Sequence, residues 1–369
     1  MDRPLQGIRV IEVAGGVPAA YCAHLLAGYG ADVVRVDGAD SPPAPHWTLS
    51  EDESTYLLPA KRRVVLDGDG DGDGDGKAAM LTELVAAADV VVLDGPPGRF
   101  DVPAWRQARP GLVAVTISPF GWTGPDRDLP ADDLIAFAAG GMMSLTGDPA
   151  ASPLLTGGAQ ALWYGGLHAF GAVTGALYGA AVQGEGDWID VSLQECLAGS
   201  LELYGPAAAY GEPAALRFGN YHRAVWALYP VADGYGGVFC LERQVPALFD
   251  AIGEEALRDE RFRDPLQRPS HDEELSAYVL SFLVDRTGDE LARLGAERKI
   301  PFGKVRTPAE LLDGDALRER GFFDTVQLPD GGTVQVPGRP FEGLGWQGGG
   351  VRRAEPEPAA AVIEGWTRP

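Results

Sequence analysis

The stretch GIRVIEVAGGVPAAYCAHLLAGYGADVVRVD, residues 7–37, decides the fold class of this chain. Residues 7–13 form a short apolar strand, and residues 18–29 carry apolar side chains at helical spacing. Residues 31–36 are a second apolar strand, closed by Asp37. A strand, a helix and a strand within about 30 residues form a βαβ unit, whose strands pair in parallel through a right-handed crossover.

The same alternation continues further along the chain. Predicted strands lie at 63–66, 89–93, 112–118 and 188–193, with a predicted helix at 77–88. This pattern predicts an α/β fold with an open parallel, Rossmann-like sheet that binds ligands at the carboxyl ends of its strands. The Gly- and Ala-rich stretch 165–181 has small residues at close spacing, which lets a helix pack tightly against its neighbours.

The middle of the chain differs in character from the beginning. A short β unit near 227–241 precedes charge-rich helical stretches such as 273–285 and 289–294. This change predicts a smaller α+β domain at 206–315, which follows a large α/β domain at 1–205.

Two stretches are dominated by turn and loop residues. The repeat DGDGDGDGDG, residues 67–76, lacks the Glu at the twelfth loop position that EF-hand calcium sites use, so it predicts a solvated flexible loop. Asp330, Gly331 and Gly332 predict a hairpin turn, and the Pro-rich tail is predicted to be irregular.

Composition limits the class of protein. A chain of 369 residues with 45% hydrophobic content can bury a substantial core, and its length favours two domains. Its five histidines and three widely spaced cysteines form neither a zinc pattern nor a disulfide framework, so we expect no metal and a reducing compartment. High usage of Ala, Gly, Asp and Arg indicates a GC-rich bacterial genome.

Charge and hydropathy exclude several partners. A net charge of −23 repels nucleic acid and anionic lipid surfaces, so an anionic ligand has to be held by a local cluster of Lys and Arg. The N-terminus lacks a signal-peptide pattern, and no apolar run approaches the roughly 18 to 20 residues of a membrane span. We therefore expect a cytoplasmic protein without a nucleic-acid or membrane partner.

Further motifs stand in order along nearly the whole chain. They are KRRVVLD (61–67), ISPFGWTGP (117–125), IDVSLQE (189–195), YPVADG (229–234), LERQVPALFDAIG (241–253), IPFGKVRTPAELL (300–312) and RGFF (320–323). Together with residues 5–37 they resemble the family III CoA-transferases of the CaiB/BaiF type, which include the α-methylacyl-CoA racemases. The resemblance implies an enzyme that binds coenzyme A or an acyl-CoA as substrate between large and small domains, together with a small carboxylic acid. It also implies an interlocked homodimer, in which segment 316–369 returns to the large domain.

The resemblance supplies candidates for the cation cluster. Arg35 and the group Lys61, Arg62 and Arg63 would lie near the nucleotide, and Arg99 stands at the family's pantetheine-side arginine. Phosphate groups favour Arg forks and Lys ammonium groups. The alternative is that these residues are solvent-exposed charges on the rim of a sheet.

The residue that carries the family's transfer chemistry is missing. In the transferases, an aspartate just ahead of the glycine-rich helix attacks the thioester and forms a mixed anhydride and then an enzyme-bound CoA thioester. The corresponding window here is GGAQALWYGG, residues 157–166, which contains no acid. The aspartate's place is taken by Gln160, Ala161 or Leu162, so transfer by the usual residue is excluded.

The racemases in this family use a His and an Asp to move a proton at the carbon alpha to the thioester, with a supporting Glu. Asp132 stands where the racemase His would be, Asp133 matches the acid beside it, and Glu242 matches the glutamate. Paired carboxylates can raise each other's pKa if both are buried. The alternative for Asp132 and Asp133 is a helix N-cap at the start of 134–139.

Three helpers complete the list of candidate catalytic residues. Tyr164 and His168 lie on the glycine-rich helical stretch, and His222 lies in the smaller domain. The alternative for Tyr164 and His168 is a role in core packing.

Three functions stay open at this point. The first is CoA transfer between carboxylic acids by non-standard chemistry, through a relocated carboxylate or direct attack of the acceptor acid. The second is a racemase, isomerase or lyase that moves a proton alpha to a thioester or similar carbonyl. The third is a repurposed family member in a specialised biosynthetic pathway, whose ligand need not be a CoA ester.

Overall fold

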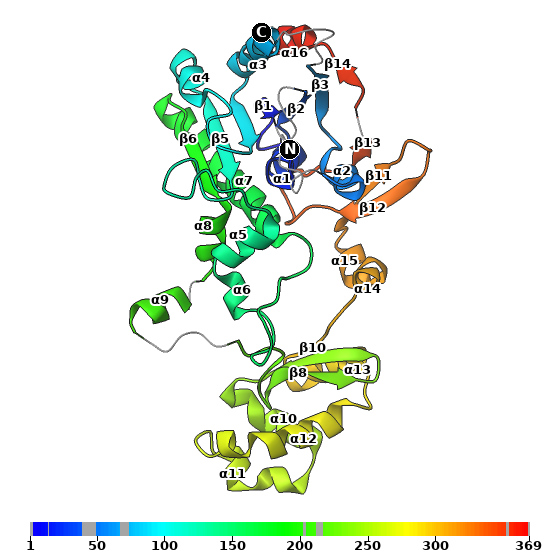
Figure 1. The fold of residues 1–369 in the computed structure, drawn as a ribbon. Coiled ribbons are helices and arrows are strands. Elements are labelled where there is room, and N and C mark those ends of the chain that lie inside the picture. The colour runs from blue at the N-terminus through cyan, green and yellow to red at the C-terminus, as the bar shows by residue number, and fades with distance from the viewer. Residues whose placement is uncertain are drawn as a thin grey trace. The chain divides into compact units, whose positions relative to one another are not determined.

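The computed structural model describes residues 3–13, 15–38, 49–66, 74–201, 204–211, 217–351 and 354–367. The chain divides into two compact units (Figure 1). Unit 1 consists of Met1–Ser144, Leu155–Ala214 and Ala316–Pro369, and unit 2 consists of Leu145–Leu154 and Ala215–Asp315.

Unit 1 is built on a seven-stranded parallel sheet with the order β14-β3-β2-β1-β4-β5-β6. Its strands are β1 (Arg9–Val13), β2 (Asp32–Asp37), β3 (Arg62–Val65), β4 (Val90–Asp94), β5 (Val113–Ser118), β6 (Trp188–Ser192) and β14 (Pro356–Glu357). The predicted open, Rossmann-like parallel sheet is confirmed, and strand order reverses between β1 and β4.

Helices cover both faces of this sheet (Figure 1). On one face lie α1 (Val17–Gly28), α2 (Glu51–Leu57), α5 (Asp133–Ala139), α7 (Gln160–Gln183) and α8 (Leu193–Ala198). On the other lie α3 (Gly74–Ala87), α4 (Val102–Ala108) and α16 (Ala359–Thr367). Neighbouring strand residues such as Val10 and Ile11 belong to opposite cores, which explains why the strands are apolar at consecutive positions.

The glycine-rich stretch packs as expected, although its helix α7 begins earlier, at Gln160. A Cβ added to Gly166 would lie 2.6 Å from the backbone oxygen of Pro18 in α1. Only glycine therefore allows α7 to approach α1 this closely.

The remaining elements of unit 1 include the predicted hairpin of β11 (Phe323–Gln327) and β12 (Thr333–Pro337), which the structure confirms. The others are α9 (Tyr204–Ala209) and β13 (Gly350–Val351), while α6 (Met142–Leu145) and α15 (Asp315–Glu319) each span a boundary between the units.

Two expectations about local structure need correction. The tail is not irregular, because β14 joins the main sheet and α16 packs on α3 through Val362 and Trp366, one helical turn apart. Helix α2 was not predicted, although Ser50 and Glu53 form a capping box at its start.

Most of the Asp-Gly repeat, 67–73, lies outside the described residues, and Gly74 already belongs to α3.

Unit 2 has a four-stranded antiparallel sheet, with the order β10-β9-β8-β7, and helices packed on one side of it. Its elements are β7 (Tyr221–Arg223), β8 (Trp226–Val231), β9 (Gly234–Phe239), β10 (Phe302–Lys304), α10 (Val245–Ile252), α11 (Glu260–Arg263), α12 (Asp272–Leu283), α13 (Gly288–Arg298) and α14 (Pro308–Asp313), with short 3-10 turns η2 (Glu242–Gln244), η3 (Glu255–Arg258) and η4 (Arg268–His271). Buried and exposed residues alternate along β8, so one face of the sheet contacts the core and the other is exposed.

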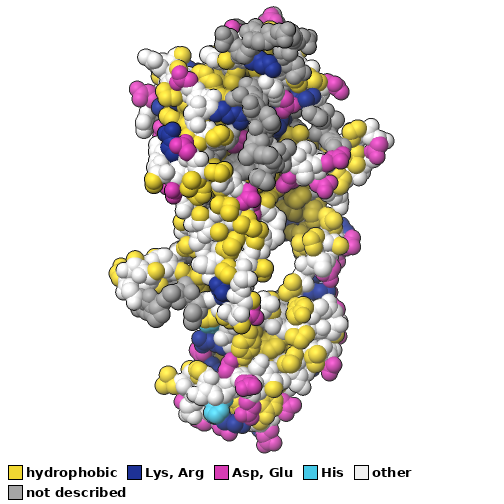
Figure 2. Space-filling model, in the orientation of Figure 1, with side chains coloured by type: hydrophobic (Ala, Val, Ile, Leu, Met, Phe, Trp, Pro, Cys, Tyr) yellow, Lys and Arg dark blue, Asp and Glu magenta, His cyan; other side chains and the backbone are white. Residues whose placement is uncertain are grey.

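The surface mixes charged and apolar side chains, with acidic groups spread over the face drawn in Figure 2. Of the helices in the described ranges, none is long and apolar enough to cross a membrane.

Candidate functional site

The crevice where strand order reverses is closed by a carboxylate of the chain itself. Asp94, at the end of β4, accepts hydrogen bonds from the amides of Gly15 (3.1 Å) and Gly16 (3.0 Å), at the start of α1. Burial raises the pKa of Asp94 to about 6, and these two amides oppose the rise only in part. Asp94 thus fills the place where a dinucleotide's pyrophosphate would meet a helix N-terminus. Sequence reasoning missed it, although an acid directly after a buried strand was a usable signal.

The predicted cation cluster does come together. Arg35, Lys61, Arg62 and Arg63 line one small, solvent-open hollow, which Ala354 also lines. Residues from β2, β3 and the C-terminal segment therefore share this hollow.

Most of these cations are already neutralised by carboxylates. Lys61, whose side chain is 2% exposed, lies 2.7 Å from Glu12, which also binds Arg35 at 2.7 Å. Burial lowers the pKa of Lys61, and Glu12 opposes that shift. Arg62 forms ion pairs with Asp32 at 3.0 Å and Glu357 at 2.7 Å.

Arg63 differs from its neighbours. Its Nε lies 2.6 Å from Asp37 Oδ2, and within the described ranges its two terminal amino groups contact no acceptor. Of the four cations in the hollow, Arg63 thus retains the most donors for an anion. Arg99 lies in the turn after β4, where its guanidinium stacks 5.1 Å from the centre of the Phe100 ring, and it does not line the hollow.

The acid-free window 157–166 receives a carboxylate from another helix. Asp133, the first residue of α5, accepts hydrogen bonds at Oδ1 from the amides of Ala161 (2.7 Å) and Leu162 (3.4 Å), in the first turn of α7. Its Oδ2 has no hydrogen-bond donor among the residues that the structure describes. Burial raises the pKa of Asp133, and the two α7 amides oppose that rise.

Local structure on both sides holds this contact. Asp132 is the N-cap of α5 and accepts a bond from the Ile135 amide at 3.0 Å, which matches the capping interpretation for this residue. Before α7, the side-chain amide of Gln160 donates to the carbonyls of Gly157 (3.1 Å) and Gly158 (3.3 Å). Ala159, between Gly158 and Gln160, has a φ of 48°, which is strained for a residue with a Cβ.

Tyr164 and His168 lie one and two turns further along α7. The Nδ1–H of His168 donates to the Tyr164 carbonyl at 2.9 Å, and the two rings stack with centres 6.0 Å apart. His168 is exposed rather than packed in the core of unit 1. Within the described ranges, neither side chain forms a hydrogen bond with Asp133.

Glu242 and His222 belong to unit 2. Both carboxylate oxygens of Glu242 accept from Nη1 of Arg268, at 2.8 and 2.7 Å, so this glutamate is held by a buried cation. His222 stacks edge-on between Phe218 and Trp226, and burial lowers its pKa, as does Arg223.

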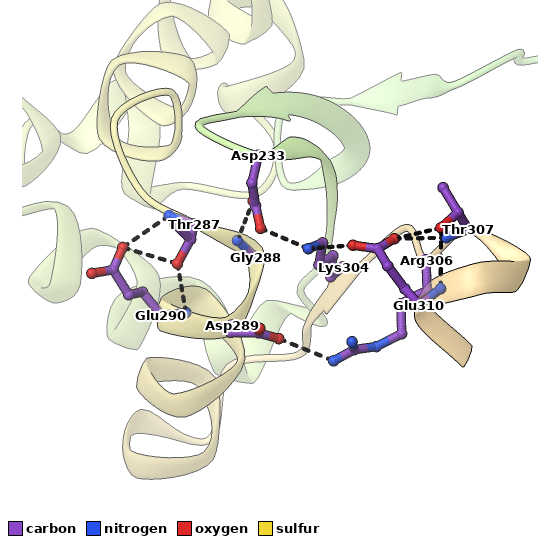
Figure 3. Close-up of polar contacts among 9 residues, drawn as sticks. All are labelled: Asp233, Thr287, Gly288, Asp289, Glu290, Lys304, Arg306, Thr307 and Glu310. Carbon is purple, nitrogen blue, oxygen red and sulfur yellow. Dashed lines mark hydrogen bonds and ion pairs between the residues drawn. The ribbon is translucent and has the colours of Figure 1, made fainter. Parts of the chain in front are cut away.

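The motif at 300–312 forms a polar network within unit 2 (Figure 3). Lys304 Nζ lies 2.6 Å from Asp233 and 2.8 Å from Glu310. Asp233 also accepts from the Gly288 amide at the start of α13, and Glu310 forms a capping box with Thr307. Lys304 therefore ties α14 to the β8–β9 turn and to α13, which explains this motif by packing.

Comparison with known proteins decides the family. The model of "CoA-transferase family III" matches residues 5–360. The chain belongs to this family. The family's succinate–glutarate CoA-transferase of Agrobacterium fabrum is 28% identical over 360 residues, covering 91% of this chain and 88% of the relative. The succinyl-CoA–D-citramalate CoA-transferase of Chloroflexus aurantiacus is 26% identical, covering 90% of this chain and 86% of the relative.

Solved structures of the family show the same fold. A CAIB/BAIF family protein from Brucella suis superposes with a TM-score of 0.80 at 25% identity, over 99% of this chain and 100% of that one. The family III relatives make this protein a transferase that handles CoA. Within the described ranges, no three His, Cys, Asp or Glu side chains gather in a way that could hold a metal ion.

Proposed function

We propose that this protein transfers CoA from an acyl-CoA to a carboxylic acid, with Asp133 as the nucleophile in place of the family's missing aspartate. The contact of Asp133 Oδ1 with the Ala161 and Leu162 amides carries the proposal, because it puts a carboxylate in the window where the chain has no acid of its own. Oδ1 is anchored, and Oδ2, which has no donor among the described residues, is the oxygen that attacks.

The proposed steps balance without an added reactant. Asp133 Oδ2 attacks the thioester carbon, the carbon–sulfur bond breaks, and CoA leaves as a thiolate from a mixed anhydride. The thiolate then attacks Cγ of Asp133, which releases the first acid and leaves an enzyme thioester. The acceptor carboxylate attacks that thioester, which expels CoA as a thiolate and forms a new mixed anhydride. The thiolate then attacks the acyl carbon of the acceptor, which yields the new acyl-CoA and restores the Asp133 carboxylate.

The amides of Ala161 and Leu162 have a second role in this scheme. When the thiolate attacks Cγ, negative charge develops on Oδ1, which these amides already contact at 2.7 and 3.4 Å. Preorganised amide donors stabilise such an oxyanion, and the positive end of the α7 dipole adds to the effect. Burial raises the pKa of Asp133, which makes its carboxylate a stronger nucleophile.

For CoA itself, we propose that Arg63 contacts a phosphate in the hollow, while Lys61 and Arg35 shape the hollow through Glu12. This assignment rests on the terminal amino groups of Arg63, which contact no acceptor among the described residues, and on the burial of the Lys61–Glu12 pair. The names of the relatives supply succinate, glutarate and D-citramalate as first acids to test. A homodimer and a cytoplasmic location stay predictions from the sequence.

The test is a matched pair of neighbouring variants. Asp133→Asn keeps an oxygen for the two amides but loses the nucleophile, whereas Asp132→Asn keeps an N-cap of equal quality. With succinyl-CoA and labelled succinate, the wild type and Asp132→Asn should exchange label into the thioester, and Asp133→Asn should lose at least about a thousandfold in rate. Peptide mass mapping should find CoA on Asp133 in the wild type.

Exchange that survives in Asp133→Asn would refute this nucleophile. Deuterium incorporation at the carbon alpha to the thioester in heavy water, without label exchange, would favour racemase-type chemistry instead. A protein that binds no CoA by calorimetry would support the repurposed alternative.

A further inference from the structure

One histidine in the core of unit 1 has no hydrogen-bond partner. His24, in α1, is 2% exposed, and within the described ranges neither of its ring nitrogens contacts a donor or acceptor. Its ring packs against Tyr56 of α2, at 4.8 Å between centres, and against Trp346 of the C-terminal segment, at 5.5 Å. A buried polar ring without a partner costs free energy, so it needs an explanation.

Trp346 is the anchor of the C-terminal segment on α1. A Cβ at Gly28 would lie 2.1 Å from Cζ3 of the Trp346 ring, so the indole occupies a notch that glycine leaves open. The indole Nε1 donates to Asp324 at 2.7 Å, and the Gln347 amide donates to the Gly28 carbonyl at 2.9 Å. The ring contacts of Trp346 include His24, whose protonation would place a charge in apolar surroundings.

Among the described residues, the charged groups near His24 either disfavour its protonation or are bound by other groups. Burial is the larger cause of the lowered pKa of His24. The positive charge of Lys61, from the segment before β3, lowers this pKa further. Glu12 is bound to Lys61 and Arg35. Tyr56 of α2 and Cys22 of α1 are neutral, since burial raises both pKa values well above neutrality. The carboxylate of Asp324 accepts a hydrogen bond from the indole N–H of Trp346.

We infer that residues 341–351 form an acid-sensitive latch, in which protonation of His24 releases Trp346 from the Gly28 notch. A neutral imidazole fits between Tyr56 and Trp346, but an imidazolium there would be a buried charge beside Lys61, with no counterion among the residues that the structure describes. Opening the latch brings the ring to water, where it can hold the proton.

The latch has a consequence for the cation hollow, which rests on the proposed function. The same C-terminal segment continues to Ala354, which lines the hollow, and to Glu357, which pairs with Arg62. Release of Trp346 would loosen that wall. Anion access to the hollow is then expected to depend on pH through His24.

The size of the effect follows from linkage. The docked His24 has a pKa of about 3, and a water-exposed histidine has one of about 6.5. Because docking lowers this pKa, docking is fully favourable above about pH 6.5 and weakens as the pH falls toward 3. Between about pH 7.5 and pH 5, the docking equilibrium should fall by up to about 30-fold.

Hydrogen exchange of the whole protein without ligand measures the latch directly. The readout is the protection of the Gln347 amide, corrected for the intrinsic pH dependence of exchange, with β4 as an internal reference. We expect Gln347 protection to fall by up to about 30-fold from pH 7.5 to pH 5 while β4 protection is unchanged. Equal protection of Gln347 at both pH values would overturn the inference, and this outcome needs no variant.

Two variants separate protonation from packing. His24→Phe keeps an aromatic ring but cannot titrate, so Gln347 should stay protected at pH 5; an unchanged pH dependence in this variant would also overturn the inference. Gly28→Ala blocks the notch, so protection should be low at both pH values. Since no acyl-CoA is used, failure of this test leaves the Asp133 proposal standing, and failure of the Asp133 test leaves the latch standing.

Discussion

Breaking the buried Glu12–Lys61 pair should destabilise unit 1 by about 3–5 kcal/mol, the cost of leaving one charge of a buried pair without its partner. The change is Glu12→Gln, which conserves volume. Glu12 is 0% exposed and bonds Lys61 and Arg35, each at 2.7 Å. Lys61 would lose its negatively charged partner and keep neutral acceptors such as the Ala20 carbonyl at 2.8 Å, with the Arg35 guanidinium as a nearby like charge.

The loss should depend on pH. Burial lowers the pKa of Lys61 below its value of 10.5 in an unfolded chain, and removing Glu12 lowers it further. A base with a lowered pKa in the folded state loses stability as the pH falls. The penalty of Glu12→Gln should therefore be larger at about pH 6 than at about pH 9.

The assay is urea unfolding, followed by circular dichroism at both pH values. Lys61→Met and the double variant Glu12→Gln/Lys61→Met complete a double-mutant cycle. The double variant should recover much of the loss, because no buried charge is left unpaired between the two positions. A loss below about 1 kcal/mol, or a double variant worse than the sum of both single ones, would refute the reasoning.

Three other predictions concern helix packing, backbone strain and acid stability. Gly166→Ala should destabilise the fold by about 1–3 kcal/mol because its Cβ would meet the α1 backbone at 2.6 Å. Gly171→Ala in the same helix, whose Cβ would meet no atom within 4 Å, should be neutral or stabilise by up to about 1 kcal/mol. Equal effects of both variants in thermal unfolding would contradict the packing argument. Ala159→Gly should stabilise by about 1 kcal/mol, since its φ of 48° is strained for alanine, and a lower melting temperature would show the strain estimate to be wrong. Lys304 and Thr307 lower the pKa of Glu310 to about 2. The Lys304–Glu310 contact therefore stabilises unit 2 above about pH 4.5, and this stabilisation is lost as the pH falls toward 2. Lys304→Met should flatten that part of the acid-unfolding curve, and an unchanged curve would contradict the network.

The candidate site was only partly within reach of sequence reasoning. The four cations of the hollow were found through the family resemblance, and they meet because Arg35 lies on β2 while Lys61, Arg62 and Arg63 lie at the start of the neighbouring strand β3. The sequence did not predict that carboxylates neutralise these cations, because Arg62 pairs with Glu357, which is 295 residues away along the chain. Asp94 was missed because its two amide donors come from the loop before α1, 78 and 79 residues earlier.

The sequence by itself determined the kinds of elements and their order, since apolar periodicity and turn residues act within a few positions of the chain. It determined the parallel sheet through the βαβ unit of 7–37, and it determined that residues 157–166 contain no acid. Tertiary structure alone decided that Asp133 reaches Ala161, 28 positions later, and that the tail folds as β14 and α16. Such contacts depend on which helices pack side by side, and helix packing is set by the whole core rather than by any local pattern.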